Sequence, residues 1–224
     1  MNGHGVNGHG VVRVLVVDDD ALVRSGLTMM LDGAGGLRVV GEAGDGDQVQ
    51  AALDAHPTDV VLMDIRMPNV NGIAATERVR ARRDPPEVIV LTTFDSDENV
   101  LRALRAGASG FLLKDSPPAR IAAAVHRVAA GEPMLSPAIT RRLMDRAATG
   151  ADAYTRARTA LAALSAREHD VAVAVGRGRT NAEIAVELHV GVATVKAHIT
   201  RVLTKLAVGN RTQIALLVHD AGLV

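Results

Sequence analysis

The stretch Val-Val-Asp-Asp, residues 16–19, ends one apolar run of this chain, and Val-Leu-Met-Asp, residues 61–64, ends another. Short apolar runs that are rich in β-branched residues are typical of buried strands. Aspartates at the tips of two such strands indicate a site for a divalent metal ion and a phosphoryl group. The same two runs belong to a pattern of short apolar runs that repeats through the first half of the chain.

Strands and helices alternate five times in that half. The expected strands are residues 11–17, 38–43, 60–63, 88–91 and 110–113. Segments with helical spacing lie between or after them, at residues 21–31, 48–55, 73–82, 98–106 and 119–130. Since crossovers between parallel strands are right-handed, this alternation predicts an α/β fold with a five-stranded, doubly wound parallel sheet and helices on both faces.

Polar side chains follow four of the expected strands. Asp18 and Asp19 follow the first strand, Asp64 the third, Thr92 the fourth and Lys114 the fifth. Each of these residues, taken alone, could have a purely structural role as a helix cap, a strand-end hydroxyl or a solvated charge. Because ligands of such sheets bind at the carboxyl ends of the strands, we expect all five to converge on one crevice.

Clustered carboxylates repel one another unless a hard cation such as Mg²⁺ joins them, so Mg²⁺ is the expected cofactor. The carboxylate of Asp64 then attacks a phosphoryl group, while Mg²⁺ and the Lys114 ammonium neutralise its charge. Thr92 can donate to a phosphoryl oxygen. Asp20 adds a third consecutive carboxylate, for which capping of the following helix is the expected role.

Length and composition allow two domains and exclude several classes of protein. A chain of 224 residues with 48% hydrophobic residues can bury one ordinary core or two small ones. It has no cysteine for disulfides or thiolate zinc sites, and no apolar stretch near the ~18 residues of a membrane span, so a cytoplasmic protein without a membrane partner is expected. Residues 1–10 predict a disordered tail, and residues 131–163 a linker with a short helix at 138–148.

The last third reads as a small all-α domain of four helices, residues 164–224. Capping boxes begin at Ser165 and Thr180, and a further helix is expected at residues 193–206. That helix has an apolar stripe and a basic outer face, and residues 131–224 carry a net charge of +4. Two helices joined by a short turn, the second one basic, are typical of a helix-turn-helix DNA-binding domain.

Residues 11–130 resemble the receiver domain of bacterial two-component response regulators, which is flavodoxin-like. The shared motifs are Val-Asp-Asp at 17–19, Met-Asp-Ile-Arg-Met-Pro at 63–68 and Gly-Ala-Ser-Gly-Phe-Leu-Leu-Lys at 107–114. The resemblance implies four Mg²⁺ ligands: Asp18, Asp19, Asp64 and the backbone carbonyl of Arg66. It also implies that Phe111 turns inward after phosphorylation and that Thr92 moves with it.

Residues 164–224 resemble the LuxR/NarL-type output domain, through Leu-Ser-Ala-Arg-Glu, Thr-Asn-Ala-Glu-Ile-Ala and Ala-Thr-Val-Lys-Ala-His-Ile. By this resemblance Lys196, Ala197 and Thr200 approach base edges of the DNA. The expected phosphate contacts are Thr194, Arg201, Lys205 and the region of Asn181. Gly191 stands where the family commonly has a serine cap, so the helix that follows begins less firmly.

The leading hypothesis is a transcription factor and not an enzyme. A sensor histidine kinase phosphorylates Asp64, the protein becomes a homodimer, and the dimer binds promoter DNA; RNA polymerase is a further candidate partner. A second hypothesis makes the receiver a phosphorylation-independent dimerisation or ligand-sensing module. A third is an aspartate-nucleophile phosphatase, because Asp18 and Asp20 form an Asp-x-Asp pair with Asp18 as the nucleophile.

Overall fold

The computed structural model describes residues 10–93, 97–132, 134–135 and 151–224. The chain divides into two compact units, Met1–Ser136 and Pro137–Val224. The expected tail, apart from Gly10, and the expected linker helix at 138–148 lie outside the described residues. In the described part of the chain, no helix is long and apolar enough to cross a membrane.

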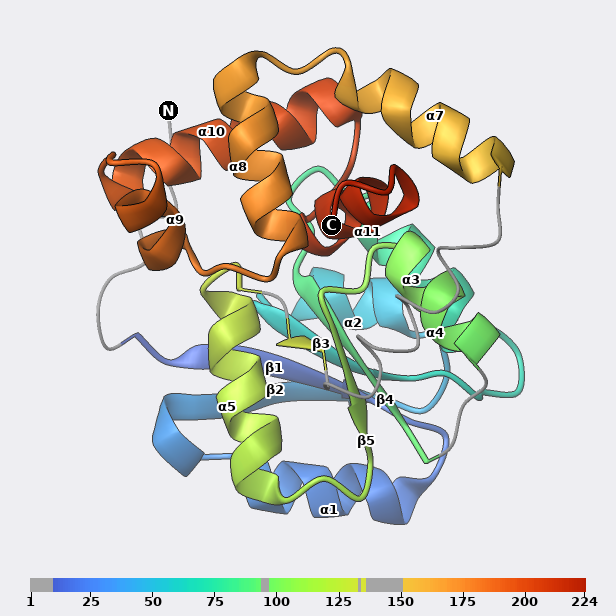
Figure 1. Cartoon of the computed structure of the whole chain (residues 1–224). Coiled ribbons are helices and arrows are strands. Elements are labelled where there is room, and N and C mark those ends of the chain that lie inside the picture. The colour runs from blue at the N-terminus through green and yellow to red at the C-terminus, as the bar shows by residue number, and fades with distance from the viewer. Residues whose placement is uncertain (1–9, 94–96, 133, 136–150) are drawn as a thin grey trace. The chain divides into compact units, whose positions relative to one another are not determined.

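The first unit is built on a parallel sheet, as the alternating pattern predicts (Figure 1). Its strands run in the order β2-β1-β3-β4-β5-β6. Their bounds are Val12–Val17 (β1), Leu37–Ala43 (β2), Val60–Asp64 (β3), Glu87–Thr92 (β4), Gly110–Leu113 (β5) and Met134–Leu135 (β6). The five expected strands are confirmed, whereas β6 is an addition inside the expected linker. A two-residue strand is too short to show a periodic pattern, and only its pairing with β5 defines it.

Helices cover both faces of this sheet (Figure 1). They are Ala21–Leu31 (α1), Val49–Ala55 (α2), Gly72–Arg80 (α3), Asp97–Arg105 (α4) and Pro118–Ala129 (α5), with a 3-10 turn η1 at Ala34–Gly36. Leu27 and Leu31 of α1 pack with Ile121 and Val125 of α5 in one core cluster. All five residues of β3 are buried, as is typical of a central strand that is covered on both sides.

The second unit consists of helices around its own core. Its helices are Ala151–Leu161 (α7), Ala166–Gly176 (α8), Asn181–Glu187 (α9), Val192–Leu206 (α10) and Arg211–Asp220 (α11). The expected four helices correspond to α8–α11. Helix α7 falls in the expected linker, but its Ala157 and Leu161 are buried in the same cluster as Val175, Val202 and Val218. It therefore packs as a fifth helix of this unit.

Both expected capping boxes are present. The Ser165 hydroxyl accepts from the N–H of Glu168 at 3.4 Å, and the Glu168 carboxylate accepts from the N–H of Ser165 at 2.8 Å. Thr180 and Glu183 form the same reciprocal pair at 3.3 and 2.7 Å. Each box satisfies two amides that would otherwise lack a partner at a helix start. Helix α10, by contrast, has Gly191 at its N-cap position and therefore lacks a side-chain cap.

Candidate functional site

Three carboxylates meet at the carboxyl ends of two neighbouring strands. Asp18 follows β1, Asp64 ends β3, and the pairing of Val17 with Met63 sets these ends side by side. One oxygen each from Asp18, Asp19 and Asp64 can be chosen so that all three lie within 4.8 Å of one another. Asp18 and Asp64 are buried, and Asp19 is exposed. Hard oxygen donors at this spacing fit a divalent cation such as Mg²⁺.

Lys114, just after β5, connects to this cluster. Its Nζ lies 2.5 Å from Asp18 Oδ2 and 3.2 Å from Asp64 Oδ2. Its backbone N–H donates to the carbonyl of Thr92 at 2.8 Å, so the ends of β4 and β5 are joined. The lysine thus neutralises part of the acidic charge and presents an ammonium beside Asp64.

Burial and charged neighbours both act on the Asp64 carboxyl. Burial raises the pKa of the Asp64 carboxyl above its ordinary value; the Lys114 ammonium opposes this rise, and the Asp18 carboxylate adds to it. A carboxylate in this position gains from a nearby cation. The residues present therefore fit Mg²⁺, with Asp18, Asp19 and Asp64 as the side chains that would hold it.

Asp18 is held by hydrogen bonds from Arg24, which no sequence motif indicates, and from the backbone of Asp20. Arg24 of α1 donates from Nη1 to the backbone carbonyl of Asp18 at 2.6 Å. The N–H of Asp20 donates to Asp18 Oδ1 at 3.0 Å, and Asp20 itself accepts from the N–H of Leu22 at 2.8 Å as the cap of α1. The capping role expected for Asp20 is confirmed. Arg24 has no recognisable signal in sequence, since an arginine on a helix is usually solvated.

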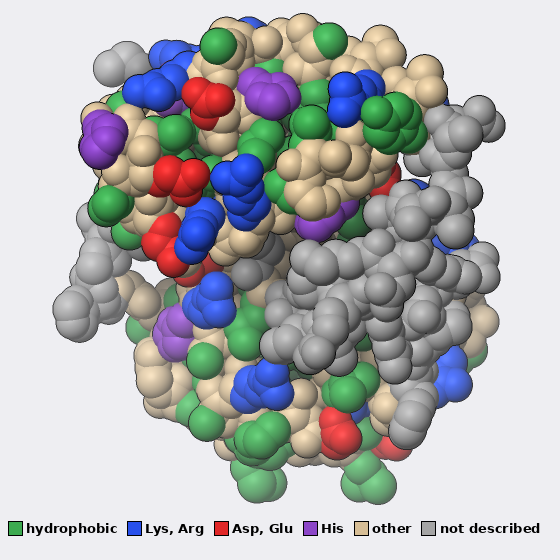
Figure 2. All heavy atoms as spheres, in the orientation of Figure 1, with side chains coloured by type: hydrophobic (Ala, Val, Ile, Leu, Met, Phe, Trp, Pro, Cys, Tyr) green, Lys and Arg blue, Asp and Glu red, His purple; other side chains and the backbone are tan. Residues whose placement is uncertain are grey.

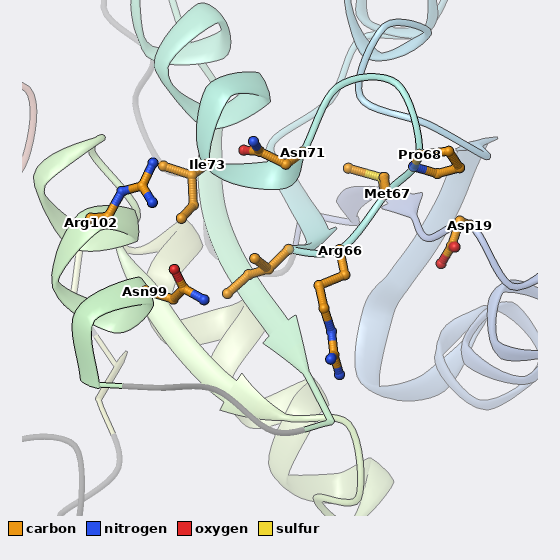
Figure 3. Close-up of a pocket in the computed structure, with 9 residues that line it drawn as sticks. Asp19, Arg66, Met67, Pro68, Asn71, Ile73, Asn99 and Arg102 are labelled. Carbon is orange, nitrogen blue, oxygen red and sulfur yellow. The ribbon is translucent and has the colours of Figure 1, made fainter.

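A pocket of about 480 Å³ lies beside Asp19. The loop between β3 and α3 lines it with Arg66, Met67 and neighbouring residues, and α4 contributes Asn99 and Arg102 (Figure 3). Arg66 donates from Nη2 to the hydroxyl of Thr93 at 3.0 Å, so its side chain bridges from this loop to the end of β4. Of the three clustered carboxylates, Asp19 is the one that lines this pocket.

The two residues expected to act as a switch, Thr92 and Phe111, are both buried. Thr92 is the last residue of β4, and Phe111 pairs with Val90 of β4 in the sheet register. Phe111 is among the largest fully buried side chains of the described residues. In this structure the aromatic side chain therefore lies inward.

Helix α10 presents the expected polar face. Val195 and Val202 are buried, and Ile199, Leu203 and Leu206 are half-buried against the core. The opposite side exposes five of the residues expected to meet DNA: Thr194, Lys196, Ala197, Thr200 and Arg201. The hydroxyl of Thr200 donates to the carbonyl of Lys196 at 3.1 Å.

The other two expected DNA contacts already have partners within the second unit. Lys205 Nζ lies 2.6 Å from Glu168 Oε2, and this hydrogen bond, with those from Ser165, lowers the pKa of Glu168 to about 2. Asn181 Oδ1 accepts from Nη1 of Arg211 at 2.5 Å, and Arg211 is buried. These pairs join residues more than 25 positions apart, so local sequence patterns could not reveal them.

Other basic residues of this unit are also paired. Arg177 lies 3.7 Å from Glu187, and Arg179 lies 3.7 Å from Glu183. Figure 2 shows Lys and Arg side chains beside Asp and Glu side chains on the visible face of this unit. These ion pairs offset part of the positive charge of the unit. The exposed Lys196 and Arg201 of α10 are therefore a better guide to an anion-binding face than the net charge of the unit.

Comparison with known proteins assigns each of the two units to a domain family. Residues 14–126 match the response regulator receiver domain, and residues 162–218 match the bacterial regulatory proteins of the luxR family. The transcriptional regulatory protein LiaR of Bacillus subtilis is 38% identical over 216 residues, which is 96% of this chain and all of LiaR. The response regulator protein VraR of Staphylococcus aureus is 32% identical, over 95% of this chain and 99% of VraR.

Solved structures agree. The response regulator ChrA of a heme-sensing two-component system is 35% identical, with a TM-score of 0.52, over 96% of this chain and 100% of ChrA. Phosphorylation and dimerisation are typical of this group of regulators. The chain belongs to the transcriptional response regulators of two-component systems that join a receiver domain to a LuxR-type DNA-binding domain.

Proposed function

We propose that Asp64 is the phosphoacceptor of this regulator. The observation that carries the proposal is the juxtaposition of the Asp64 carboxylate with those of Asp18 and Asp19, together with the Lys114 ammonium at 3.2 Å. Asp64 stands at the end of the central strand β3, where its backbone is fixed by pairing with β4. A nucleophile in a fixed position beside a lysine suits phosphoryl transfer.

In the proposed reaction a carboxylate oxygen of Asp64 attacks the phosphorus of a phosphohistidine on a sensor histidine kinase. An O–P bond forms, the N–P bond breaks, and the leaving imidazole nitrogen takes up a proton from solvent. Lys114 then exchanges part of its contact with Asp64 for a phosphoryl oxygen, and Thr92 donates its hydroxyl to another. Mg²⁺, when held by Asp18, Asp19, Asp64 and the carbonyl of Arg66, supplies the positive charge that offsets the transferred group.

The acyl phosphate then biases the receiver between two states. We propose that the hydroxyl of Thr92 follows the new phosphoryl group and that Phe111 responds to its movement. Phe111 is buried within the sheet, so we propose that it responds by a change of packing in the β5 region. The phosphorylated state forms the homodimer, in keeping with what is typical of the family.

The proposed DNA interface is the exposed face of α10. Lys196 is the main candidate for direct readout, Thr200 also approaches a base edge, and Ala197 offers an apolar contact to a thymine methyl group. Thr194 and Arg201 hold phosphates. Lys205 is 42% exposed in its side chain. Its ammonium has three donors, so it can reach a phosphate while it remains bound to Glu168.

Asn181 contributes in a different way. Its side-chain oxygen is engaged by Arg211, so we propose that its backbone N–H, at the start of α9, faces a phosphate. Phosphotransfer and promoter binding imply three further partners: a sensor histidine kinase, promoter DNA, and RNA polymerase at the regulated promoter. We propose that the protein meets these partners in the cytoplasm.

Mapping the phosphoryl group tests the proposed chemistry. The full-length protein is incubated with phosphoramidate and Mg²⁺, the acyl phosphate is reduced with borohydride, and the modified aspartate is located by mass spectrometry. Modification at Asp64, absent from Asp64→Asn, is the expected result. Modification at Asp18 instead would overturn the assignment and favour an aspartate-nucleophile phosphatase, while no modification would favour a receiver that works without phosphorylation.

A further inference from the structure

Asp45 is a buried carboxylate outside the acidic cluster. It stands between β2 and α2 and is 3% exposed. Its oxygens accept hydrogen bonds from the N–H groups of Asn69 and Val70, both at 2.9 Å, and from the N–H of Asp47 at 3.3 Å. Asn69 and Val70 belong to the loop between β3 and α3. Asp45 therefore ties that loop to the neighbouring loop after β2.

The two loops also touch through their backbones. A Cβ added to Gly46 would lie 2.3 Å from the carbonyl oxygen of Val70 and 3.0 Å from the Cβ of Ala75. The first of these separations is shorter than any allowed contact with a backbone atom. Glycine at this position is thus what allows Asp45 to come within hydrogen-bonding distance of Asn69 and Val70.

The loop in question runs from the phosphoacceptor to the start of α3. Its far end is fixed, because the N–H of Gly72 donates to the carbonyl of Ile65 at 2.9 Å and Asn71 caps α3. A Cβ on Gly72 would lie 1.9 Å from the carbonyl oxygen of Asp64. Arg66 lies in this loop, between Asp64 and Gly72. Asn69 and Val70 follow Arg66 in the same loop, and Asp45 holds them by hydrogen bonds to their N–H groups.

The bonds to Asp45 are of the strong, charge-assisted kind. Burial raises the pKa of the Asp45 carboxyl, but the N–H groups of Asn69, Val70, Asp47 and Gly46 lower it by more, so the pKa lies below its ordinary value. The group is therefore ionised at neutral pH, and hydrogen bonds to an ionised acceptor are about twice as strong as neutral ones. Such bonds can hold a loop in one conformation.

We propose that Asp45 is a positioning residue for the Mg²⁺ site: by bonding the amides of Asn69 and Val70 it holds the β3–α3 loop so that Arg66 and Asp64 face the same ion. The inference rests on the proposed function, in which the Arg66 carbonyl is a ligand. Without Asp45, the loop would have to be ordered when the metal binds. Loss of residues that orient metal ligands typically weakens binding by about 10- to 100-fold.

The test compares full-length variants by calorimetric titration with Mg²⁺ alone. Asp45→Ala is expected to weaken Mg²⁺ binding by at least about tenfold, and Asp45→Asn to fall between it and wild type, since an amide keeps one acceptor oxygen. Asp59→Ala is the matched control. Asp59 also accepts from a backbone N–H, that of Arg13 at 2.8 Å, but it lies at the opposite end of the sheet from Asp64.

Amide hydrogen exchange gives a second readout that does not depend on metal. The N–H groups of Asn69 and Val70 are expected to be protected in wild type and in Asp59→Ala, and to exchange rapidly in Asp45→Ala. Gly46→Ala leaves the carboxylate in place but forces the loops apart, so it should reproduce both effects. It also keeps the test valid if Asp45→Ala does not fold.

The inference is overturned if Asp45→Ala and Asp59→Ala bind Mg²⁺ equally well, or if Asn69 and Val70 stay protected without the carboxylate. These outcomes are separate from the fate of the proposed function. If Asp64 in wild type took no phosphoryl group, the assignment of the phosphoacceptor would fail, while the Mg²⁺ titration would still decide whether Asp45 positions the site.

Discussion

Replacing Asp64 by asparagine should stabilise the receiver when no Mg²⁺ is present. The variant keeps the shape of the side chain and an oxygen that accepts from Lys114, but it removes one of three clustered negative charges. At an effective dielectric constant of about 20, Lys114 at 3.2 Å attracts the Asp64 carboxylate by about 5 kcal/mol, and each neighbouring carboxylate, taken at 4.8 Å, repels it by about 3.5 kcal/mol.

The two repulsions together exceed the attraction by about 2 kcal/mol. Burial of the Asp64 carboxylate adds to this cost, and solvent around the exposed Asp19 reduces it. We therefore expect Asp64→Asn to raise the free energy of unfolding of the receiver by about 1 to 2 kcal/mol in EDTA. With saturating Mg²⁺ the wild type should recover most of the difference, because the ion offsets the same repulsion.

Hydrogen exchange of the β3 amides, measured as a function of urea concentration, reports on the receiver without interference from the second unit. Asp59→Asn makes the same chemical change where the carboxylate accepts from two side-chain donors of Arg13, at 2.7 and 3.0 Å, so it should destabilise. Since the pKa of Asp64 is raised in the folded state, the cost of its charge should shrink as the pH falls through that pKa. A lower stability of Asp64→Asn than of wild type in EDTA would refute the reasoning.

Three further predictions concern other parts of the chain. Gly72→Ala should slow phosphorylation of Asp64 at least about tenfold, since its Cβ would displace the backbone carbonyl of the phosphoacceptor; intact-mass spectrometry during phosphoramidate treatment measures the rate. In wild type, the Glu168–Lys205 pair should contribute stability above about pH 4.5 that is lost as the pH falls toward 2, and Lys205→Met should lose most of that pH dependence; circular dichroism during acid titration compares the two. Arg201→Gln should lower the slope of log affinity against log salt by about 1 for duplex DNA, measured by fluorescence anisotropy, whereas an unchanged slope would remove Arg201 from the phosphate contacts.

The fold of the first unit could be predicted because its signals are local. The apolar runs that end at Val17 and Met63 are strands in the structure, and right-handed crossovers leave only a few arrangements for such an alternation. Strand β6 could not be predicted, because two residues carry no period and its pairing with β5 is a tertiary event. Helix α7 lies in an alanine-rich stretch that indicates a linker, and the burial of its Leu161 depends on tertiary packing that the local pattern does not show.

The acidic cluster could be predicted for a similar reason. Asp18, Asp64 and Lys114 each follow a strand, and the topology brings strand ends together. Arg24 and Asp45 could not be found in this way, because both act through backbone groups that only the folded loops bring near them. Lys205 shows the converse: its position on α10 indicated a DNA contact, but no local pattern pointed to its partner Glu168, 37 residues away.

Sedimentation velocity tests the central claim, that phosphorylation of Asp64 controls assembly. Wild type and Asp64→Asn are compared with and without Mg²⁺ and beryllofluoride, which mimics the phosphoryl group. A shift from monomer to dimer is expected for wild type with both additions and for no other sample. Equal behaviour of wild type and Asp64→Asn under all conditions would contradict it.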